Sequence, residues 1–530
     1  MNKSLPRPFQ KTLTGALAVN GECPKTLIEK QPHYLMIDEN ITVHDQYQFE
    51  IKLGYPVKKE AFTSYDIETY FFIPESLGIN RYSYPKSDFY SDMKSYVRFR
   101  TPRRVLKNVL EGENCPWERV TQSLDAFIQK PTPHFYKAAG AFADFEHQTQ
   151  MFCCITKGAF KQQIQDVISS TAADRSIQVL RYVEDVNTLK KLFREWGKKM
   201  SLHLVPQTRL IYHFANEFLS LTIEDYTFLL LEKLKTLGFP KELEAPLLSL
   251  IHDELNERRV ESYPSIPEKG RDFENLLYRK SVLKKYMESV LFLKTHTEKE
   301  GRVLNEILFG VAAGFAMIFA TAVLFFSSYR FGTLTVPVFA LLVLSYMCKD
   351  RIKEWLRSYF NEQMQRFLFD HKTEIFYHPK KIIGWCKENS SFVKNEQIPE
   401  KIMEIRNCDH TTEIEHGHLQ EKTIQYRRQI RIFNQRLKKN YPRAMIEGLT
   451  DIMRFNLSNL VKKMSDSKKD VFLTDGSGYY KTQGERIYHL NMIFKYSTGD
   501  TVSYQRYRIV LNREGIKRIE KVPASKSEVS

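Results

Sequence analysis

The segment Ile307–Phe326, with the sequence ILFGVAAGFAMIFATAVLFF, contains 20 residues and no charged side chain. As an α-helix it would be about 30 Å long, which matches the hydrocarbon thickness of a lipid bilayer. Uncharged apolar stretches of this length are typical of membrane-spanning helices, whereas shorter ones occur in the cores of soluble proteins. The segment therefore predicts a membrane helix, with a buried helix pair in a soluble domain as the alternative.

A second uncharged segment, Phe331–Cys348, follows after a short connector. It would form a helix of about 27 Å. Thr333, Thr335 and Pro337 make its beginning less apolar, so a re-entrant segment is an alternative, although proline is tolerated in the first turn of a helix. We expect a transmembrane helical hairpin over residues 304–348.

The positive charges around these segments predict the side of the membrane on which the rest of the chain lies. Positively charged flanks remain on the cytoplasmic side, and residues 1–15 lack the apolar stretch of a cleavable signal peptide. We therefore expect an integral protein of the cell (inner) membrane, with both large flanks and both termini in the cytoplasm. The cations expected to orient the second helix are Lys349, Arg351, Lys353 and Arg357.

Small residues recur along the first apolar segment, at Gly310, Gly314, Ala316 and Ala320. Such spacings let another helix approach closely. We expect these residues to pack against the second helix of the same hairpin, with dimerisation as the alternative. Because neither segment contains a charged residue, a channel or transporter is disfavoured.

The composition of the 530-residue chain is that of folded domains rather than of a polytopic membrane protein. The hydrophobic content of 42% and aromatic content of 13% argue against disorder. The mean hydropathy of −0.42 excludes a chain built mostly of membrane helices. Single cores stop growing near about 250–300 residues, so we expect more than one folded unit. The seven cysteines form no C-x-x-C pair, which favours a reducing cytosol.

Positive charge is concentrated after the hairpin. Residues 349–530 contain 35 Lys and Arg against 23 Asp and Glu, a net charge of +12 out of +16 for the whole chain. A basic domain beside a membrane is attracted to anionic lipid headgroups, by about 1 kcal/mol for each well-placed cation. Nucleic acid is disfavoured as a partner because no nucleic-acid-binding signature accompanies the charge. We expect the bilayer and its anionic headgroups as partners, with another protein or a second copy as further candidates.

The patterns of apolar residues predict soluble α+β parts on both sides of the hairpin. Alternating aromatic and β-branched residues predict strands up to Ile73, and helical spacings predominate from residue 155. The amphipathic segment Asp272–Leu293 is expected to form, with the helix after the hairpin, a helical stalk below the membrane. The expected units are a flexible lead (1–33), a β-rich α+β domain (34–150), a helical region (151–303), the hairpin (304–348), a membrane-proximal helix (349–371), a basic α+β domain (372–521) and a flexible tail (522–530).

The C-terminal domain is expected to contain a helix over Pro442–Met464 and to end in a β meander. Three strand-like segments, IYHLNMIFKYS, TVSYQRYRIVL and IKRIEKV, are separated by turn residues. This is the clearest antiparallel β pattern in the chain.

Asp66 and Glu68, in the sequence Asp66-Ile67-Glu68-Thr69, lie on a predicted strand. Alternation along a strand places both carboxylates on one face. The four residues resemble the first motif of DEDD-type exonucleases, which implies two metal ions for phosphodiester cleavage. No further acidic pair completes the set, and a solvated acidic strand face is the alternative.

Cys408, His410, His416 and His418 form the pattern C-x-H-x5-H-x-H. Thiolate and imidazole are ligands that Zn²⁺ prefers. An ordinary polar loop is the alternative, because the spacing matches no common structural zinc module.

No complete catalytic motif and no cofactor-binding motif occurs in the sequence. We therefore expect a scaffold or signal-relay component rather than an enzyme, without a cofactor. The alternatives are a membrane-anchored, metal-dependent hydrolase that uses Asp66 and Glu68, and a membrane tether for nucleic acid.

Overall fold

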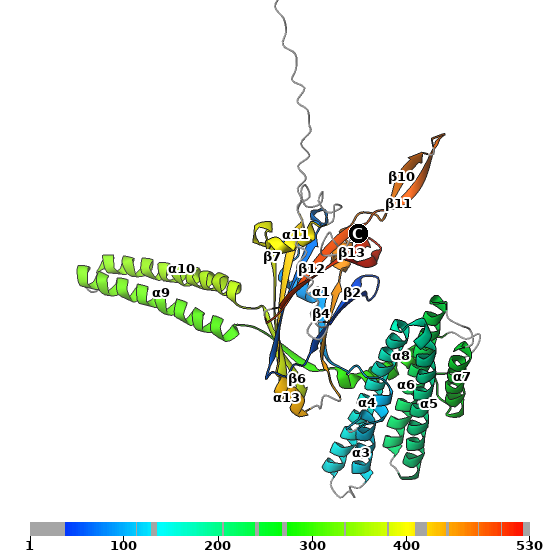
Figure 1. The fold of residues 1–530 in the computed structure, drawn as a ribbon. Coiled ribbons are helices and arrows are strands. Elements are labelled where there is room, and N and C mark those ends of the chain that lie inside the picture. Colours follow the sequence, from blue (N-terminus) through cyan, green and yellow to red (C-terminus); the bar gives the residue numbers. More distant parts are fainter. Residues whose placement is uncertain are drawn as a thin grey trace, which may run out of the picture.

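The fold combines a β-sandwich, a helical bundle on one side of it and a pair of long helices that projects from the other side (Figure 1). The expected flexible lead (1–33) lies outside the described residues, as does the expected tail except Val522. The computed structural model describes residues 38–112, 114–128, 135–203, 206–238, 243–267, 273–332, 335–378, 381–408, 421–440, 445–474, 476–499 and 501–522.

The larger sheet of the sandwich has antiparallel strands in the order β14-β13-β12-β3-β8-β7-β6-β5. Three of them, β12 to β14, form the C-terminal meander, so this prediction is confirmed. The strands are β3 (Thr63–Ile73), β5 (Lys294–Lys299), β6 (His371–His378), β7 (Lys381–Val393), β8 (Lys422–Ile432), β12 (Tyr488–Thr498), β13 (Thr501–Asn512) and β14 (Gly515–Val522).

The smaller sheet has the order β1-β2-β9-β4 and packs face to face with the larger one. Its strands are β1 (Asp38–Val43), β2 (Gln48–Pro56), β4 (Met93–Arg100) and β9 (Gly448–Asn456). Aromatic rings fill the space between the sheets, since the ring centres of Phe71 and Phe455 are 5.3 Å apart and those of Tyr55 and Tyr65 are 5.0 Å apart. Such burial of aromatic side chains is the main stabilising contribution in a sandwich.

Strands from before and after the hairpin are neighbours in both sheets. In the larger sheet β3 lies between β8 and β12, and in the smaller sheet β9 lies between β2 and β4. The strands of the two regions that the sequence suggests as separate domains (34–150 and 372–521) therefore build one sandwich. Local patterns indicate which segments are strands, but the pairing of strands distant in the chain depends on tertiary packing.

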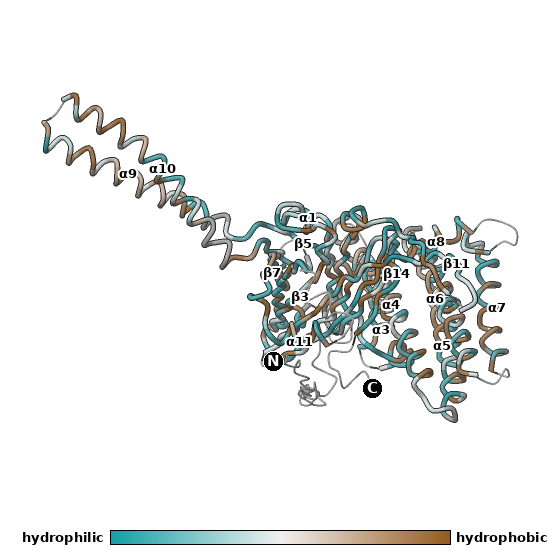
Figure 2. The backbone as a smooth tube through the Cα atoms, turned by 90° about the horizontal axis from the view of Figure 1, so that it is seen from above, coloured by the Kyte–Doolittle hydropathy of each residue, from teal (hydrophilic) through white to brown (hydrophobic). Residues whose placement is uncertain are grey.

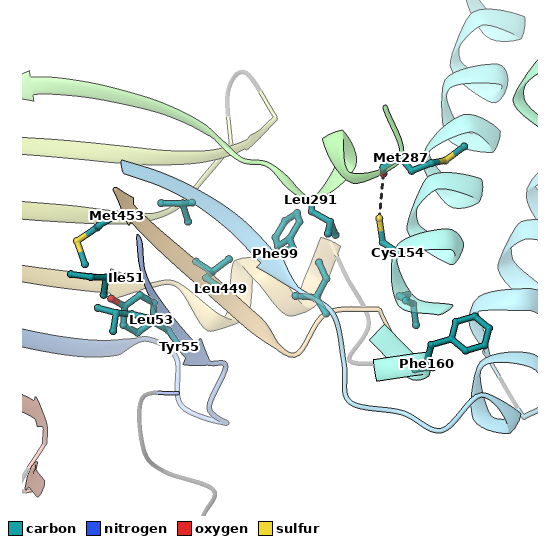
Figure 3. Packing of buried hydrophobic residues seen from close by; sticks show 14 of the residues in the cluster. Ile51, Leu53, Tyr55, Phe99, Cys154, Phe160, Met287, Leu291, Leu449 and Met453 are labelled. Carbon is teal, nitrogen blue, oxygen red and sulfur yellow. Dashed lines mark hydrogen bonds between the residues drawn. The ribbon is translucent and has the colours of Figure 1, made fainter. Parts of the chain in front are cut away.

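The central helices of the chain form the bundle, so helices in this part of the chain are confirmed, but α2, α3 and the start of α4 precede the helical region expected from residue 151. Its core is continuous with that of the sandwich, because Phe99 and Leu291 lie between sandwich residues such as Leu449 and bundle residues such as Met287 (Figure 3). The helices are α2 (Lys107–Leu110), α3 (Pro116–Ile128), α4 (Phe135–Ser169), α5 (Ala172–His203), α6 (Pro206–Thr236), α7 (Glu244–Val260) and α8 (Glu274–Glu288).

Several short elements complete the fold. Helix α11 covers one end of the outer face of the larger sheet, where Ile402 and Ile405 pack against Tyr70 and Phe72. The two-stranded ribbon β10–β11 projects from the body (Figure 1). These elements are η1 (Glu75–Leu77), α1 (Lys86–Asp92), η3 (Ser289–Leu291), η4 (Asn395–Gln397), α11 (Glu400–Arg406), α13 (Asn434–Asn440), α14 (Ser458–Val461), β10 (Lys468–Thr474) and β11 (Tyr479–Glu485).

The helix expected over Pro442–Met464 is wrong, because the central part of that segment, Gly448–Asn456, is strand β9. β9 pairs with a strand on each side, and its inward face, which includes Leu449, Met453 and Phe455, is buried. Leu449, Ile452, Met453 and Phe455 are separated by intervals of three and four residues as well as two, so these buried apolar residues also fit a helical spacing. Periodicity alone cannot separate these two structures.

The projecting pair consists of α9 (Arg302–Phe331) and α10 (Val336–Phe367). The expected stalk that joins the amphipathic segment Asp272–Leu293 to the membrane helix is wrong, because α8 ends at Glu288 and β5 intervenes before α9. After the turn, α10 is one continuous helix, and it includes residues 349–367 of the membrane-proximal helix that the sequence predicts over 349–371.

One helix of the described residues is long and apolar enough to cross a membrane, the segment Asn305–Phe331 of α9, of which only 11% is buried. The sequence predicted two such helices. The second is shorter than expected, because α10 begins at Val336 rather than Phe331 and reaches its first charge at Lys349. Its uncharged part is therefore about 20 Å long.

Candidate functional site

The helix pair α9–α10, called the hairpin below, leaves the sandwich through the edge strand β5 and its neighbour β6. Lys299 at the end of β5 pairs with His371 at the start of β6. Between β5 and α9, Gly301 has a φ of +79°, and a Cβ atom there would lie 2.1 Å from Cδ1 of Leu368. Glycine is needed at this point both for the left-handed backbone and for the close approach. Both ends of the hairpin therefore join the same edge of the same sheet.

Two acidic residues hold the chain where the hairpin meets the sandwich. Glu300 forms an ion pair with Lys387 and accepts a hydrogen bond from the backbone N–H of Phe369 at 3.1 Å. Asp370 accepts hydrogen bonds from Lys86 Nζ at 2.7 Å and from the Tyr90 hydroxyl at 2.9 Å. Burial and the Asp370 charge raise the pKa of Tyr90 above its usual range, so the phenol is neutral and donates. We call these residues, Glu300, Asp370, Lys86, Tyr90 and Lys387, the polar base.

A buried charge cluster lies between the two sheets. The Arg428 guanidinium on β8 contacts Glu388 on β7 at 2.9 Å and Asp451 on β9 at 2.7 Å. The Tyr426 hydroxyl donates to the same Glu388 carboxylate at 2.7 Å. Burial raises the pKa of Asp451, and Arg428 acts in the opposite direction. Since Asp451 belongs to the smaller sheet and Glu388 to the larger, Arg428 joins the two sheets.

His371 connects the polar base to this cluster. Its ring packs edge-on against Tyr90 with centres 4.5 Å apart, and its Nδ1 lies 4.0 Å from Oε1 of Glu388. A series of contacts thus runs from Asp370, just after α10, through the Tyr90 and His371 rings toward Glu388, which belongs to the cluster that joins both sheets. Such packed polar networks can transmit a displacement of one element to another.

Two contacts define how α9 and α10 lie against each other. The Ser345 hydroxyl donates to the backbone carbonyl of Ala320 at 3.4 Å, and the Arg357 guanidinium lies 4.2 Å from the ring centre of Phe309. In this antiparallel register Lys349 lies opposite Ala316. The charged part of α10 is therefore beside the apolar first half of α9, as the colouring of Figure 2 shows.

This register limits how deeply the hairpin can enter a bilayer. If Ile307 lay at the hydrocarbon boundary, Lys349, Asp350 and Arg351 would lie near the bilayer centre, at a cost of about 2.5–3.5 kcal/mol each. Keeping the first half of α9 out of the hydrocarbon sacrifices only about 0.3–0.6 kcal/mol for each of its five large apolar residues. The cost of placing these charges in the hydrocarbon exceeds what is lost by leaving the five apolar residues outside it. The hydrocarbon boundary is therefore expected near Lys349. The five residues are Ile307, Leu308, Phe309, Val311 and Phe315.

The small residues of α9 divide into two sets. Ala316 is 1% exposed and faces α10, and Ala320 accepts the bond from Ser345. Gly310 and Gly314 are exposed on another side of α9, where a Cβ atom would have no neighbour within 4 Å. In the described residues these two glycines do not take part in packing within the hairpin.

Asp66 and Glu68 lie on β3, on the outer face of the larger sheet, and both are occupied as hydrogen-bond acceptors. Glu68 accepts from Lys495 Nζ at 2.9 Å and from the Tyr70 hydroxyl at 2.8 Å, and Asp66 accepts from Gln429 Nε2 at 2.8 Å. Burial raises the pKa of Glu68, but Lys495 and Tyr70 lower it more, so the pKa lies below its usual value. The pair has the contacts of a structural sheet face.

The second metal pattern is only partly visible. Cys408 is half-buried, whereas His410, His416 and His418 lie outside the described residues. Within the part of the chain that the structure describes, no three or more His, Cys, Asp or Glu side chains are grouped to hold a metal ion.

The sequence interpretation missed the Arg428 cluster and the polar base. One signal was present, because Arg428 occupies an inward position of β8 between Tyr426 and Ile430, where alternation predicts an apolar residue. The partners Glu388 and Asp451 come from strands distant in the chain, so the sequence does not indicate them.

No family model, curated protein or solved structure matches the chain.

Proposed function

We propose that the protein is an integral protein of the inner membrane that acts as a scaffold or signal-relay component. In this proposal the hairpin enters the bilayer, and the sandwich and the bundle are held on the cytoplasmic side together with both termini. The observation that carries the proposal is α9, which is apolar over 20 residues, largely unburied and directed away from the body (Figure 1). An exposed apolar surface of this size marks contact with lipid or protein.

The sheet topology supports the same-side arrangement. β3 pairs with β8 and β12, which supports a placement of the chain before the hairpin and the chain after it on the same side of a membrane that the hairpin enters. The cations Lys349, Arg351, Lys353 and Arg357 on α10 would favour the side with anionic headgroups. The basic C-terminal strands would add a weaker attraction over a longer distance.

The relay part of the proposal rests on the polar contacts below the hairpin. The polar base and His371 join α10 to the Arg428 cluster, so a shift of the hairpin would reach both sheets. A protein partner on the bundle or the sandwich would then receive the signal. The hydrolase alternative gains no support from the contacts of Asp66 and Glu68.

Membrane fractionation of a hairpin-replacement variant tests the anchor. Residues 302–367 are replaced by a short Gly/Ser linker, which preserves Glu300, Gly301 and Asp370 at the base. We expect the full chain to remain in the membrane pellet after alkaline carbonate, and the variant to be soluble and to unfold at a similar temperature. Release of the intact full chain by carbonate would overturn the proposal.

A further inference from the structure

We infer that the hairpin enters the bilayer from the cytoplasmic side and turns back inside it without crossing. This inference rests on the proposed membrane anchor and specifies how the anchor sits. Its partner is the cytoplasmic leaflet of the bilayer, with the lipid phosphates around the charged part of α10 and the turn held in the hydrocarbon about 5 Å beyond the bilayer centre.

The first step is length. The part of the hairpin in which both helices are uncharged is limited by α10 and contains the 13 residues Val336–Cys348. This part is about 20 Å long, which is about 10 Å less than the hydrocarbon core. Although α9 alone is long enough to cross, its first half lies beside the charges of α10 and cannot enter without them.

The second step is side-chain direction. Helical side chains tilt toward the N-terminus of their helix. The N-terminus of α10 is at the turn, and Lys349 Nζ indeed lies 3.7 Å from the ring centre of Tyr346, on the turn side. Arg330 at the end of α9 has the opposite tilt, toward the body. Neither cation is directed so that its side chain could bridge the missing 10 Å or so to a headgroup layer. With the turn inside the hydrocarbon one charge, Arg330, remains there, whereas crossing would bring three charges, Lys349, Asp350 and Arg351, into the hydrocarbon.

The third step is the position of the charges of α10. Lys349, Arg351, Lys353 and Arg357 extend over about 12 Å of helix directly below the uncharged part. That length covers the headgroup layer, which is about 5–8 Å thick on each side of the core. The four cations would therefore contact the phosphates of the cytoplasmic leaflet.

Thiol labelling in sealed vesicles of known orientation tests the inference. The full chain with Ser328→Cys, in a Cys348→Ala background, is treated with a membrane-impermeant maleimide, and the same chain without the new thiol is the control. We expect no labelling at position 328 in right-side-out or inverted vesicles, and full labelling after detergent. Labelling in right-side-out vesicles would show that the turn crosses and would overturn the inference alone.

Labelling in inverted vesicles without detergent would show that the turn is not inserted and would also overturn it. If such a chain is released by carbonate as well, the membrane anchor itself fails, so the two failures are distinguishable.

A gain-of-function variant sharpens the test. Lys349→Leu, Asp350→Leu and Arg351→Leu together extend the uncharged part of α10 to Ile352, or about 26 Å. We expect position 328 then to become labelled in right-side-out vesicles. The matched control, Glu354→Leu with Arg357→Leu, leaves the boundary at Lys349 and should remain unlabelled. Identical labelling of both variants would contradict the role of these charges.

Discussion

Arg428 is the residue on which the joining of the two sheets depends most. Its guanidinium is 3% exposed and neutralises two buried carboxylates, Glu388 and Asp451, from different sheets. A buried ion pair adds little net stability compared with apolar residues, but removal of one partner leaves an uncompensated charge. The cluster therefore makes the sandwich specific and sensitive to single substitutions.

We predict that Arg428→Met lowers the free energy of unfolding by about 3–5 kcal/mol, because Glu388 and Asp451 then lack a counter-charge. Chemical denaturation of the soluble hairpin-replacement variant measures this change. The control is Arg427→Met on the same strand, whose side chain is exposed and whose effect should be within about 0.5 kcal/mol. Equal effects of the two substitutions would refute the role of the cluster.

A second prediction at the residue scale concerns how the contribution of Glu68 to stability depends on pH. Its pKa in the folded protein is below 4.5, so its contribution to stability is present above pH 4.5 and is lost as the pH falls through the folded pKa. We predict that Glu68→Gln lowers the free energy of unfolding by about 1–2 kcal/mol at neutral pH, with a difference that shrinks below pH 4.5.

Urea unfolding between pH 3 and 7 measures the effect of Glu68→Gln, with the exposed Glu75→Gln as control. A difference that grows on acidification would contradict the assignment of Glu68 as an ionised acceptor.

At the scale of elements, the hairpin was visible in the sequence but its register was not. The apolar runs predict two helices, and α9 and α10 are present. The start of α10 at Val336 and the placement of Lys349 beside Ala316 depend on side-chain packing between the helices. Uncharged length in the sequence therefore overestimates the part of the hairpin available to the hydrocarbon.

Gly301 is the element-scale test of the hairpin base. We predict that Gly301→Ala destabilises the protein by about 1–2 kcal/mol or more, because alanine disfavours the left-handed backbone and its Cβ atom would meet Leu368. Thermal unfolding in detergent measures the effect.

The matched control is Gly310→Ala in α9, where a Cβ atom has no neighbour within 4 Å and the substitution should be neutral or slightly stabilising. A loss of stability with Gly310→Ala would instead indicate that a second copy occupies this side of α9.

For the whole molecule, local sequence patterns predict which segments are helices or strands better than they predict which strands pair with one another. The central helices and the terminal meander follow from periodicity, whereas the β9 segment predicts a helix because its buried apolar residues also fit a helical spacing. The single sandwich built from both flanks could not be predicted, since it depends on pairs such as Glu68 with Arg427, which are distant in the chain. The Arg428 cluster remained hidden for the same reason.

The shared sheets predict that the two halves of the chain assemble when the turn of the hairpin is cut. Co-expressed fragments 1–332 and 335–530 should co-purify, because β3 lies between β8 and β12 and β9 lies between β2 and β4. Affinity purification through a tag on one fragment measures this.

In the matched control, Thr69→Pro in central strand β3 removes a ladder hydrogen bond and should reduce recovery of the partner fragment. Fragments that fold and purify separately would contradict the shared sandwich.

The most direct test of the anchored arrangement is protease protection of the full chain, tagged at both ends, in sealed membrane vesicles. We predict that protease removes both tags in inverted vesicles and neither tag in right-side-out vesicles, because the two flanks build one body, which the proposal places on the cytoplasmic side. Removal of one tag in each orientation, or of either tag in right-side-out vesicles, would contradict this account.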